Sequence, residues 1–341
     1  MLKRMQMDWF EQITGFVERD FDTTQARLSV VDGLLHSTHS DRTCAVGHLE
    51  TPTLSELRQR AAQWTTEQGA TRVSCIQGDA RKLHRDSRNA GALFQVASQF
   101  NLLEMTGPAV IPEDGVTCYA GDATQGPACA IAAGAGTIYR NYLAPVHGHP
   151  GQRANRQIDC LHDVGAALGN VEGALWKMQN GYCFATEQGL ASVDAKLELL
   201  SETQRDEVML RLRIGLHRDV EVTDRDAGHR VSQAYCSALP VAYNRVRNPA
   251  RWARFASLVL DAAYEATLLS AVLNRAMNGN PIVFLTRLGG GVFGNDPRWI
   301  SAAVRRSLNS CRDAGLDVRI VSHGDPDPGM LAIVDEWNDD Q

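Results

Sequence analysis

The stretch "LTRLGGGVFGND", at residues 285–296, decides the fold class of this 341-residue chain. A short β-branched and aromatic run at 281–285 precedes it, which predicts a buried strand. Asp296 and Pro297 come at its end, a pair typical of a helix N-cap and the first helical position. The glycines therefore occupy a strand-to-helix turn, where backbone N–H groups and a helix N-terminus can bind an anion such as phosphate. A tight turn without a ligand is the alternative.

Two nucleotide-binding motifs can be compared with these glycines. Gly289, Gly291 and Gly294 match G-x-G-x-x-G, the dinucleotide-binding motif, so an NAD-dependent oxidoreductase is one alternative. That motif belongs at the start of a doubly wound sheet, whereas most of this chain precedes the glycines. A P-loop is excluded, because no Gly-Lys-Ser/Thr follows.

Strand and helix patterns alternate along most of the chain, which predicts a layered α/β fold. Residues 1–69 differ, because their spacing predicts helices and loops. Beyond them, strands are predicted at 71–79, 90–101, 208–222, 229–243 and 316–322, and helices at 126–143, 164–179, 250–276 and 298–311.

Composition limits the classes of partner and the compartment. The net charge is -6, so neither a nucleic-acid surface nor an anionic-membrane surface is expected. The most apolar segment contains Asp261 and Glu265, which indicates a buried helix and not a membrane span. The first twelve residues lack the apolar run of a signal peptide, so a cytoplasmic protein is expected.

The cysteines and histidines give no sign of a metal centre or a redox site. The eight cysteines form no C-x-x-C pair, and most lie in apolar patterns, which is typical of reduced core thiols. The histidines of "VHGHP" at 146–150, with His162, lack a convincing set of four ligands. We therefore expect no metal and no cofactor.

Three segments, in this order along the chain, resemble the macrodomain family. They are "IQGDARKLHRDSRNAGALFQVASQFNLLE" at 76–104, "YEATLLSAVLNRA" at 264–276 and "FLTRLGGGVFGNDPRWISAAV" at 284–304. The resemblance covers about 70–325, with an insertion near 140–180, a helical extension at 1–69 and a C-terminal tail at 326–341. It implies a three-layer α/β/α sandwich that binds ADP-ribose at the strand ends.

The resemblance also implies which residues contact ADP-ribose. Asp79 matches the aspartate that accepts a hydrogen bond from the adenine amino group, Asn101 matches the loop asparagine near the distal ribose, and Phe293 would stack near that ribose. The remaining contacts would come from Thr124, Gln125 and Gly126 in a ribose-and-phosphate loop, and from Gly289, Gly290, Gly291, Val292, Phe293, Gly294 and Asn295 in a diphosphate loop. The alternatives are a helix N-cap for Asp79, turns for Asn101 and 124–126, and a core position for Phe293.

The segment "EDGVTCYAGDATQGPACAI" at 113–131 departs from the usual run of glycines in the first loop. It resembles a bacterial branch of macrodomains that removes ADP-ribose from arginine on proteins, ubiquitin among them. Poly(ADP-ribose) glycohydrolases are more distant, because their paired-glutamate signature is absent. The resemblance therefore implies a hydrolase of the N-glycosidic bond to arginine, with ADP-ribose and an ADP-ribosylated protein as partners.

Candidate catalytic acids lie in the same segment. If 116–119 forms a short strand, Asp114 and Asp122 lie at its two ends beside the ribose loop, and Glu113 competes for the same role. Two acids near a glycosidic carbon can position water and stabilise an oxocarbenium-like transition state. The alternative is that both aspartates serve turns. A module that binds ADP-ribose without cleaving it is the main alternative function.

Overall fold

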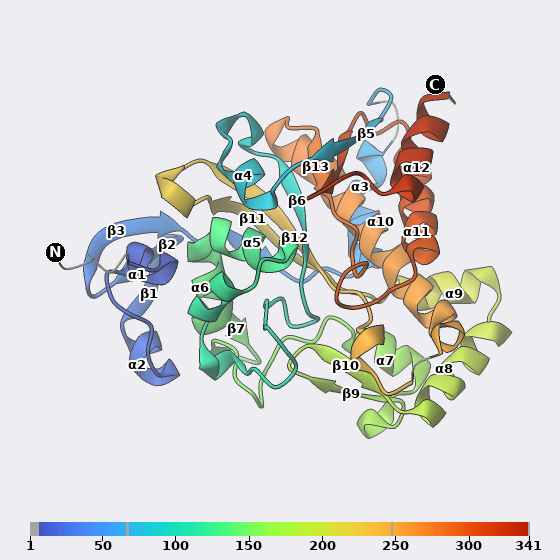
Figure 1. Ribbon diagram of the computed structural model, residues 1–341, viewed down its shortest axis with the longest axis horizontal. Coiled ribbons are helices and arrows are strands. Elements are labelled where there is room, and N and C mark those ends of the chain that lie inside the picture. Colours follow the sequence, from blue (N-terminus) through green and yellow to red (C-terminus); the bar gives the residue numbers. More distant parts are fainter. Residues whose placement is uncertain (1–6, 66–67, 247, 340–341) are drawn as a thin grey trace.

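The computed structural model describes residues 7–65, 68–246 and 248–339, and it has a seven-stranded mixed sheet at its centre (Figure 1). The strand order is β4-β11-β12-β6-β13-β14-β5. The five strands from β12 to β5 are parallel, whereas β11 pairs antiparallel with both β12 and β4. The bounds are β4 His48–Glu50, β5 Arg72–Gln77, β6 Leu93–Ala97, β11 Gly215–Glu221, β12 Arg230–Cys236, β13 Ile282–Leu285 and β14 Asp317–Ser322.

Helices cover both faces of this sheet because its central strands are apolar on both sides. In β6, Leu93 belongs to one core cluster and its neighbour Phe94 to another, as the alternation of side chains along a strand predicts for a sheet buried on both faces. Figure 1 shows α4, α5 and α6 on one side and α3, α10, α11 and α12 on the other. Their bounds are α3 Leu54–Ala61, α4 Ala80–Arg85, α5 Gln125–Ala132, α6 Gly134–Tyr142, α10 Ala253–Asn278, α11 Pro297–Ser310 and α12 Pro328–Asp339. The predicted three-layer α/β/α arrangement is confirmed.

Helix α10 is the central element of the larger core. By length and composition it could cross a membrane, but 89% of its most apolar window is buried inside the fold. Its Glu265 is 5% exposed and accepts hydrogen bonds from Arg58 of α3 and Arg306 of α11. The predicted buried helix is therefore confirmed, with its acidic residues paired to cations from neighbouring helices.

The N-terminal region differs from the helical extension predicted for 1–69. Helices α1 (Trp9–Thr14) and α2 (Phe21–Ala26) are followed by an antiparallel sheet of β1 (Leu28–Val31), β2 (Leu34–Ser37) and β3 (Ser40–Ala45). Strand β4 then joins the central sheet. The sequence contained a signal for this sheet at Asp32-Gly33, which lies between two apolar runs. Asp-Gly is a strong indicator of a β-hairpin turn, and both residues have positive φ in the structure.

Two further predictions were wrong, one near the middle of the chain and one at its C-terminal end. The predicted helix at 164–179 is only α7 (His162–Leu168), followed by the hairpin β9 (Trp176–Gln179) and β10 (Tyr182–Ala185), and the C-terminal tail is the helix α12. The indole N–H of Trp337 in α12 donates to the carbonyl of Thr71 beside β5, at 2.9 Å. The remaining strands and α-helices are the short pair β7 (Pro145–Val146) and β8 (His149–Pro150), and the helices α8 (Glu187–Leu199) and α9 (Glu202–Met209).

All eight cysteines are free thiols, and six of them are buried, as the sequence predicts. Cys75 is half-buried. Cys118 is exposed, because it lies on the outer side of a short 3₁₀ helix, Thr117–Gly121, and not in an apolar element.

Candidate functional site

A cavity of about 650 Å³ lies at the carboxyl ends of the parallel strands β5, β6, β13 and β14. Open α/β sheets commonly bind ligands at this edge. Its walls come from the segments that follow the four strands, from the N-terminal end of α5, and from Tyr182 of the β9–β10 hairpin. The predicted glycine loop is one of these walls.

The glycines of the loop at 286–296 have different reasons to be glycine. Gly289 has φ 73°, and a Cβ there would lie 2.4 Å from the Cβ of Ala238, so both backbone and packing exclude a side chain. Gly294 has φ 70° and approaches Ala242. Gly291 lines the cavity, and a Cβ there would meet nothing within 4 Å. Two glycines therefore shape the turn, and Gly291 leaves the cavity wall open.

The loop presents unpaired backbone donors. Its own bonds join Gly290 N to Arg287 O and Gly294 N to Gly291 O, both at 3.0 Å. Within the part of the chain that the structure describes, the N–H groups of Gly289, Gly291, Val292 and Phe293 donate to no protein group. All four residues line the cavity. Such consecutive N–H groups suit an anion, as the sequence predicts for a diphosphate.

Gly290, Gly294 and Asn295 were predicted to contact the ligand, but they do not line the cavity. Asn295 is 3% exposed, and its side-chain amide donates to the carbonyl of Leu239 at 2.9 Å. Its backbone N–H donates to the carbonyl of Gly289. These residues hold the loop in shape behind its ligand-facing side.

We predict that Gly291→Val weakens the binding of ADP-ribose by at least about a hundred-fold, a loss of about 2.7 kcal/mol, and leaves the fold intact. The valine side chain would extend into the cavity where the anion would lie, while its Cβ would meet no protein atom. Calorimetry with ADP-ribose measures the affinity. Gly107→Val is the matched control, because Gly107 also faces open space but lies outside the cavity. Unchanged affinity in a folded Gly291 variant would remove the phosphate-loop assignment.

The N-terminal end of α5 forms the opposite wall, and Thr124, Gln125 and Gly126 all line the cavity. The side chain of Gln125 is bonded to the edge of β6: it accepts from Ala97 N at 2.9 Å and donates to Gln95 O at 2.7 Å. This pairing fixes the helix end against the sheet. Gln125 and Gly126 have no backbone acceptor within the described residues, so their N–H groups add to the positive end of the helix dipole.

Gly126 permits a very close approach between α5, the sheet and one acidic residue. A Cβ at this position would lie 2.1 Å from the carbonyl oxygen of Ala97 and 2.2 Å from Oε2 of Glu104. No larger residue fits there without moving the carboxyl group. The glycine therefore serves the geometry of the site as well as the turn.

Asp79 lines the cavity and also caps α4. Its Oδ1 accepts from the backbone N–H of Lys82 at 2.8 Å. No second protein donor within the described residues uses its Oδ2. This geometry allows Asp79 to cap the helix and to contact a ligand at the same time. Oδ1 accepts from the helix, and Oδ2 remains available to a ligand.

We predict that Asp79→Asn weakens ADP-ribose binding by about ten- to a hundred-fold. With Oδ1 retained as the cap, the amide nitrogen takes the place of Oδ2, and a donor cannot accept from the adenine amino group. A hydrogen bond to a charged group is worth about 1.5–3 kcal/mol. Calorimetry should also show that affinity for ribose phosphate is unchanged. Asp20→Asn, a similar cap on α2, is the control. If the Asp79 variant still prefers ADP-ribose over ribose phosphate, Asp79 is a cap only.

Glu104 is the acidic residue that lies deepest in the cavity wall. It is 2% exposed, and its Oε1 has no hydrogen-bond partner. Its backbone N–H donates to the hydroxyl of Tyr119 at 3.0 Å. Burial raises the pKa of the carboxyl well above 4.5; Arg140 opposes this shift and Asp122 adds to it. A neutral carboxylic acid at this place is a candidate proton donor.

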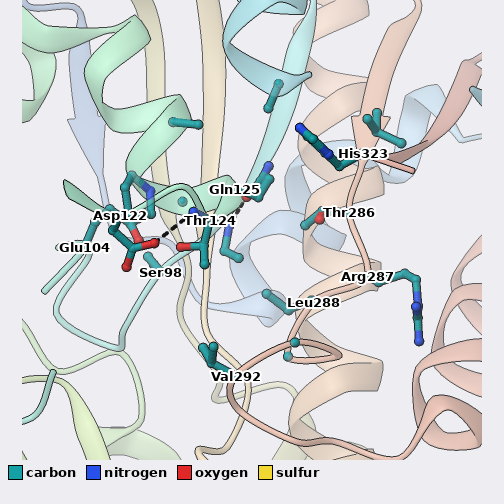
Figure 2. Close-up of a pocket in the computed structure, with 18 of the residues that line it drawn as sticks. Ser98, Glu104, Asp122, Thr124, Gln125, Thr286, Arg287, Leu288, Val292 and His323 are labelled. Carbon is teal, nitrogen blue, oxygen red and sulfur yellow. Dashed lines mark hydrogen bonds between the residues drawn. The ribbon is translucent and has the colours of Figure 1, made fainter. Parts of the chain in front are cut away.

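Asp122 lies beside Glu104 at the same end of the cavity (Figure 2). It is half-buried, and its Oδ1 accepts from the backbone N–H of Thr124 at 2.8 Å. Figure 2 shows the two carboxyl groups with Ser98 and Thr124 at one end, and Thr286 and His323 at the other. The site thus combines a buried carboxyl and a more exposed one, next to the N-terminal end of a helix.

The structure does not bring Asp114 or Glu113 to this site. The strand expected at 116–119 is wrong, because the segment forms the 3₁₀ helix Thr117–Gly121. The Oδ2 of Asp114 accepts from the backbone N–H of Ile111, and the carboxylate of Glu113 accepts from the backbone N–H of Ala154. Neither residue lines the cavity. A local turn uses the carboxylate of Asp114, and a contact with the distant Ala154 uses that of Glu113, so the geometric basis for pairing Asp114 with Asp122 is absent.

Asn101 is also outside the cavity lining. It is fully buried; its side chain donates to Gln157 and accepts from the backbone N–H of Leu103. It acts as the turn former that the sequence left as the alternative. Gln99, two residues earlier, does line the cavity, but its amide is bonded to the backbone of Met105.

Aromatic residues form the wall next to the glycine loop. Phe293 is 9% exposed and lies 5.5 Å from Tyr182 and 5.7 Å from Tyr243, measured between ring centroids. The hydroxyl of Tyr182 donates to the carbonyl of Met105 at 3.1 Å. The insertion near 140–180 therefore ends in a hairpin that supports the segment carrying Glu104.

Sequence reasoning missed several residues of this site. Glu104, Tyr182, Tyr243 and His323 line the cavity, and none of them was a candidate. Glu104 had a signal, because it is the one charged residue within the apolar run Leu102–Met105. Tyr182, Tyr243 and His323 had none, since only the fold brings them to the cavity. Among the described residues, no group of three or more His, Cys, Asp or Glu could hold a metal ion.

Comparison with families and curated proteins finds no match to this chain. Comparison with solved structures finds poly(ADP-ribose) glycohydrolases. One, from Deinococcus radiodurans in complex with ADP-ribose, is 13% identical, with a TM-score of 0.44, covering 86% of this chain and 94% of that one. Another, from Thermomonospora curvata bound to the inhibitor ADP-HPD, is 12% identical, with a TM-score of 0.46, covering 92% and 95%. Likeness at this level assigns neither a substrate nor a residue role to this chain.

Proposed function

We propose that this protein is a macrodomain-like hydrolase that removes ADP-ribose from a protein side chain. The observation that carries the proposal is the pair Glu104 and Asp122 at one end of a cavity whose other walls offer free N–H groups to an anion. A protein that only binds ADP-ribose has no use for a buried carboxylic acid at the end of its site, since burying such a group costs stability. A hydrolase uses it in the transition state.

The shape of the cavity supports one orientation of the ligand. The free N–H groups of the glycine loop suit the diphosphate, and Oδ2 of Asp79 suits the adenine amino group. The distal ribose then lies at the N-terminal end of α5, near Thr124. This orientation brings the glycosidic carbon to the end of the cavity where Glu104 and Asp122 lie.

In the proposed reaction Glu104 is the general acid. The bond between the ribose carbon and the leaving nitrogen breaks, its electron pair leaves with the nitrogen, and the nitrogen takes the proton of Glu104. The Asp122 carboxylate stabilises the positive charge that develops on the ribose and orients a water molecule. The water oxygen bonds to the ribose carbon, and a proton from that water restores the carboxyl group of Glu104.

We further propose that the linkage is to arginine. The substrate guanidinium would leave as a neutral guanidine when the bond to the ribose breaks, and the proton of Glu104 would return it to a guanidinium. The half-buried carboxylate of Asp122 can also pair with the guanidinium of the substrate, because charge-assisted bonds to a guanidinium are strong. The pairing with Asp122 favours a cationic linkage over a carboxylate or a hydroxyl linkage, and the proton donor favours a leaving group more basic than a carboxylate.

One assay tests the reaction and the linkage together. The protein is incubated with proteins carrying ADP-ribose on arginine, glutamate or serine, with ADP-ribosylated ubiquitin among the arginine substrates, and released ADP-ribose is measured. We expect release from the arginine-linked substrates. Binding of ADP-ribose without release from any linkage would favour the non-catalytic binding module. Failure to bind ADP-ribose, together with binding of NAD and hydride transfer, would favour the oxidoreductase.

A further inference from the structure

A completely buried arginine lies behind the carboxyl pair. Arg140 of α6 is 0% exposed. Its Nε donates to the carbonyl of Leu102 at 3.1 Å, and its Nη2 donates to the hydroxyl of Thr137 at 3.0 Å. Its Nη1 lies 3.1 Å from Nδ1 of His217, and its Cζ lies 3.8 Å from the centroid of the Tyr235 ring. The guanidinium is thus held on all sides.

This cation has neutral hydrogen-bond partners. Within the part of the chain that the structure describes, no carboxylate lies within 4.0 Å of it, although buried cations normally pair with an acid. Burial lowers the pKa of His217 well below 6.5, and Arg140 lowers it further, so His217 is neutral and accepts from Arg140. A buried charge without a counter-ion is expensive, which calls for a functional reason.

Arg140 acts on the segment that carries Glu104 in two ways. The carbonyl that it binds belongs to Leu102, which has φ 65°, a conformation that a leucine adopts only when its surroundings enforce it. The same turn is fixed by Gln152, whose amide donates to the carbonyl of Asn101 at 3.0 Å and reaches the carbonyl of Arg140. The backbone position of Glu104 therefore depends on this arginine.

The second effect is electrostatic. The groups that interact with the Glu104 carboxyl come from every element packed around it. Five of them are acidic or neutral: Asp122 before α5, Tyr119 of the 3₁₀ helix, Cys129 of α5, Tyr182 of β10 and Tyr235 of β12. Arg140 is the cation in this set, and it favours the ionised form of Glu104. The raised pKa values of Tyr119, Cys129, Tyr182 and Tyr235 keep those four groups neutral.

We propose that Arg140 is the positioning residue for Glu104: it holds the turn before the acid and supplies the positive charge that stabilises the carboxylate left after proton transfer. This inference rests on the proposed function. The free enzyme keeps the proton on Glu104, and the ionised form exists only between protonation of the leaving nitrogen and return of a proton from water. Arg140 therefore interacts most strongly at the stage when the glycosidic bond is broken, as transition-state stabilisation requires.

The test is a titration of the Glu104 carboxyl that needs no substrate. Protein labelled with ¹³C at the glutamate side-chain carboxyl is followed by NMR from acid to alkaline pH, and the Glu104 signal is assigned by its loss in Glu104→Gln. In Arg140→Gln and Arg140→Met we expect the midpoint to rise by about 1 pH unit or more. Methionine is included because a thioether packs well over the Tyr235 ring if glutamine fails to fold. In Arg140→Lys, which keeps the charge, the midpoint should stay near the wild-type value.

Kinetics with the arginine-linked substrate provide the second readout. In Arg140→Gln and Arg140→Met, which remove the positive charge, the rate should fall at least about ten-fold at pH values where Glu104 is protonated. The alkaline limb of the pH–rate profile should move to higher pH by the same amount as the NMR midpoint. The inference would be overturned if a folded Arg140→Met variant kept both the wild-type titration midpoint of Glu104 and the wild-type alkaline limb of the pH–rate profile. If the wild type cleaves no substrate, the proposed function fails, and the titration still decides the electrostatic role of Arg140.

Discussion

Glu104→Gln is expected to lower the single-turnover rate of ADP-ribose release by about a hundred- to ten-thousand-fold, the range of general acid catalysis. Glutamine keeps the shape of the side chain beside Gly126 but has no acidic proton to give to the leaving nitrogen. Affinity for ADP-ribose should change little, because the diphosphate and adenine contacts lie elsewhere in the cavity. Rapid-quench measurement of released ADP-ribose gives the rate. Glu113→Gln, an equivalent change outside the cavity, is the control.

The pH dependence follows from the raised pKa of Glu104. The wild-type rate should be highest where Glu104 is protonated and should fall as the pH rises through its pKa. The residual rate of Glu104→Gln should lack this alkaline limb. A limb that persists in the glutamine variant would show that another group supplies the proton.

The same substitution should stabilise the protein at neutral and alkaline pH. Because the pKa of Glu104 lies above 4.5 in the folded state, folding binds its proton more tightly, and the stability that this contributes is complete below about pH 4.5. It is lost as the pH rises through the folded-state pKa, whereas glutamine has no proton to lose. Denaturant unfolding at pH 4 and pH 8 should show a gain for Glu104→Gln that is larger at pH 8.

Asp122→Asn is expected to lower the single-turnover rate by about a hundred-fold or more. Positive charge develops on the ribose only in the transition state, so the loss of a negative charge there affects the rate more than the affinity. Asparagine can still accept from Thr124 N, which keeps the turn intact.

Asp114→Asn is the matched control for this prediction. Its carboxylate serves a similar local turn, with Ile111 N as donor, but lies outside the cavity. We expect the rate of this variant to equal the wild-type rate. Equal rates for both asparagine variants would remove Asp122 from the mechanism, whereas loss of rate in Asp114→Asn alone would return the role to the residue that the sequence suggested.

The elements that were predicted correctly are those whose start and end are marked by nearby residues in the sequence. Strands β5, β6, β13 and β14 are short runs bounded by glycine, proline or polar residues, and α11 begins at Pro297 with Asp296 as its N-cap, as predicted. The N-terminal sheet was missed because helical spacing was extended across Asp32-Gly33. The antiparallel strand β4 could not be predicted, because its three residues gain their conformation by pairing with β11, far along the chain.

The sequence predicted the parts of the site that are formed by backbone groups. It did not predict the parts formed by side chains that the fold brings together from distant positions. The glycine loop and the end of α5 have sequence signals, because positive φ and close approach select glycine at 289 and 126. Asp114 and Asp122 look alike in sequence, since both stand in turn-forming pairs, and only the fold shows that one carboxylate faces the cavity. The raised pKa of Glu104 depends on its burial among elements that lie far apart in the sequence, so no short stretch of sequence could reveal it.

The order of the strands has a consequence for how the chain is made. Strand β5 pairs with β14 alone, and β14 is the last strand in the sequence. During synthesis residues 72–77 therefore have no neighbouring strand until residues 317–322 have left the ribosome. Closing so long a segment is slow, and an unpaired apolar strand is prone to aggregate in the interval. The wall that carries Asp79 can therefore form only after residues 317–322 have been synthesised.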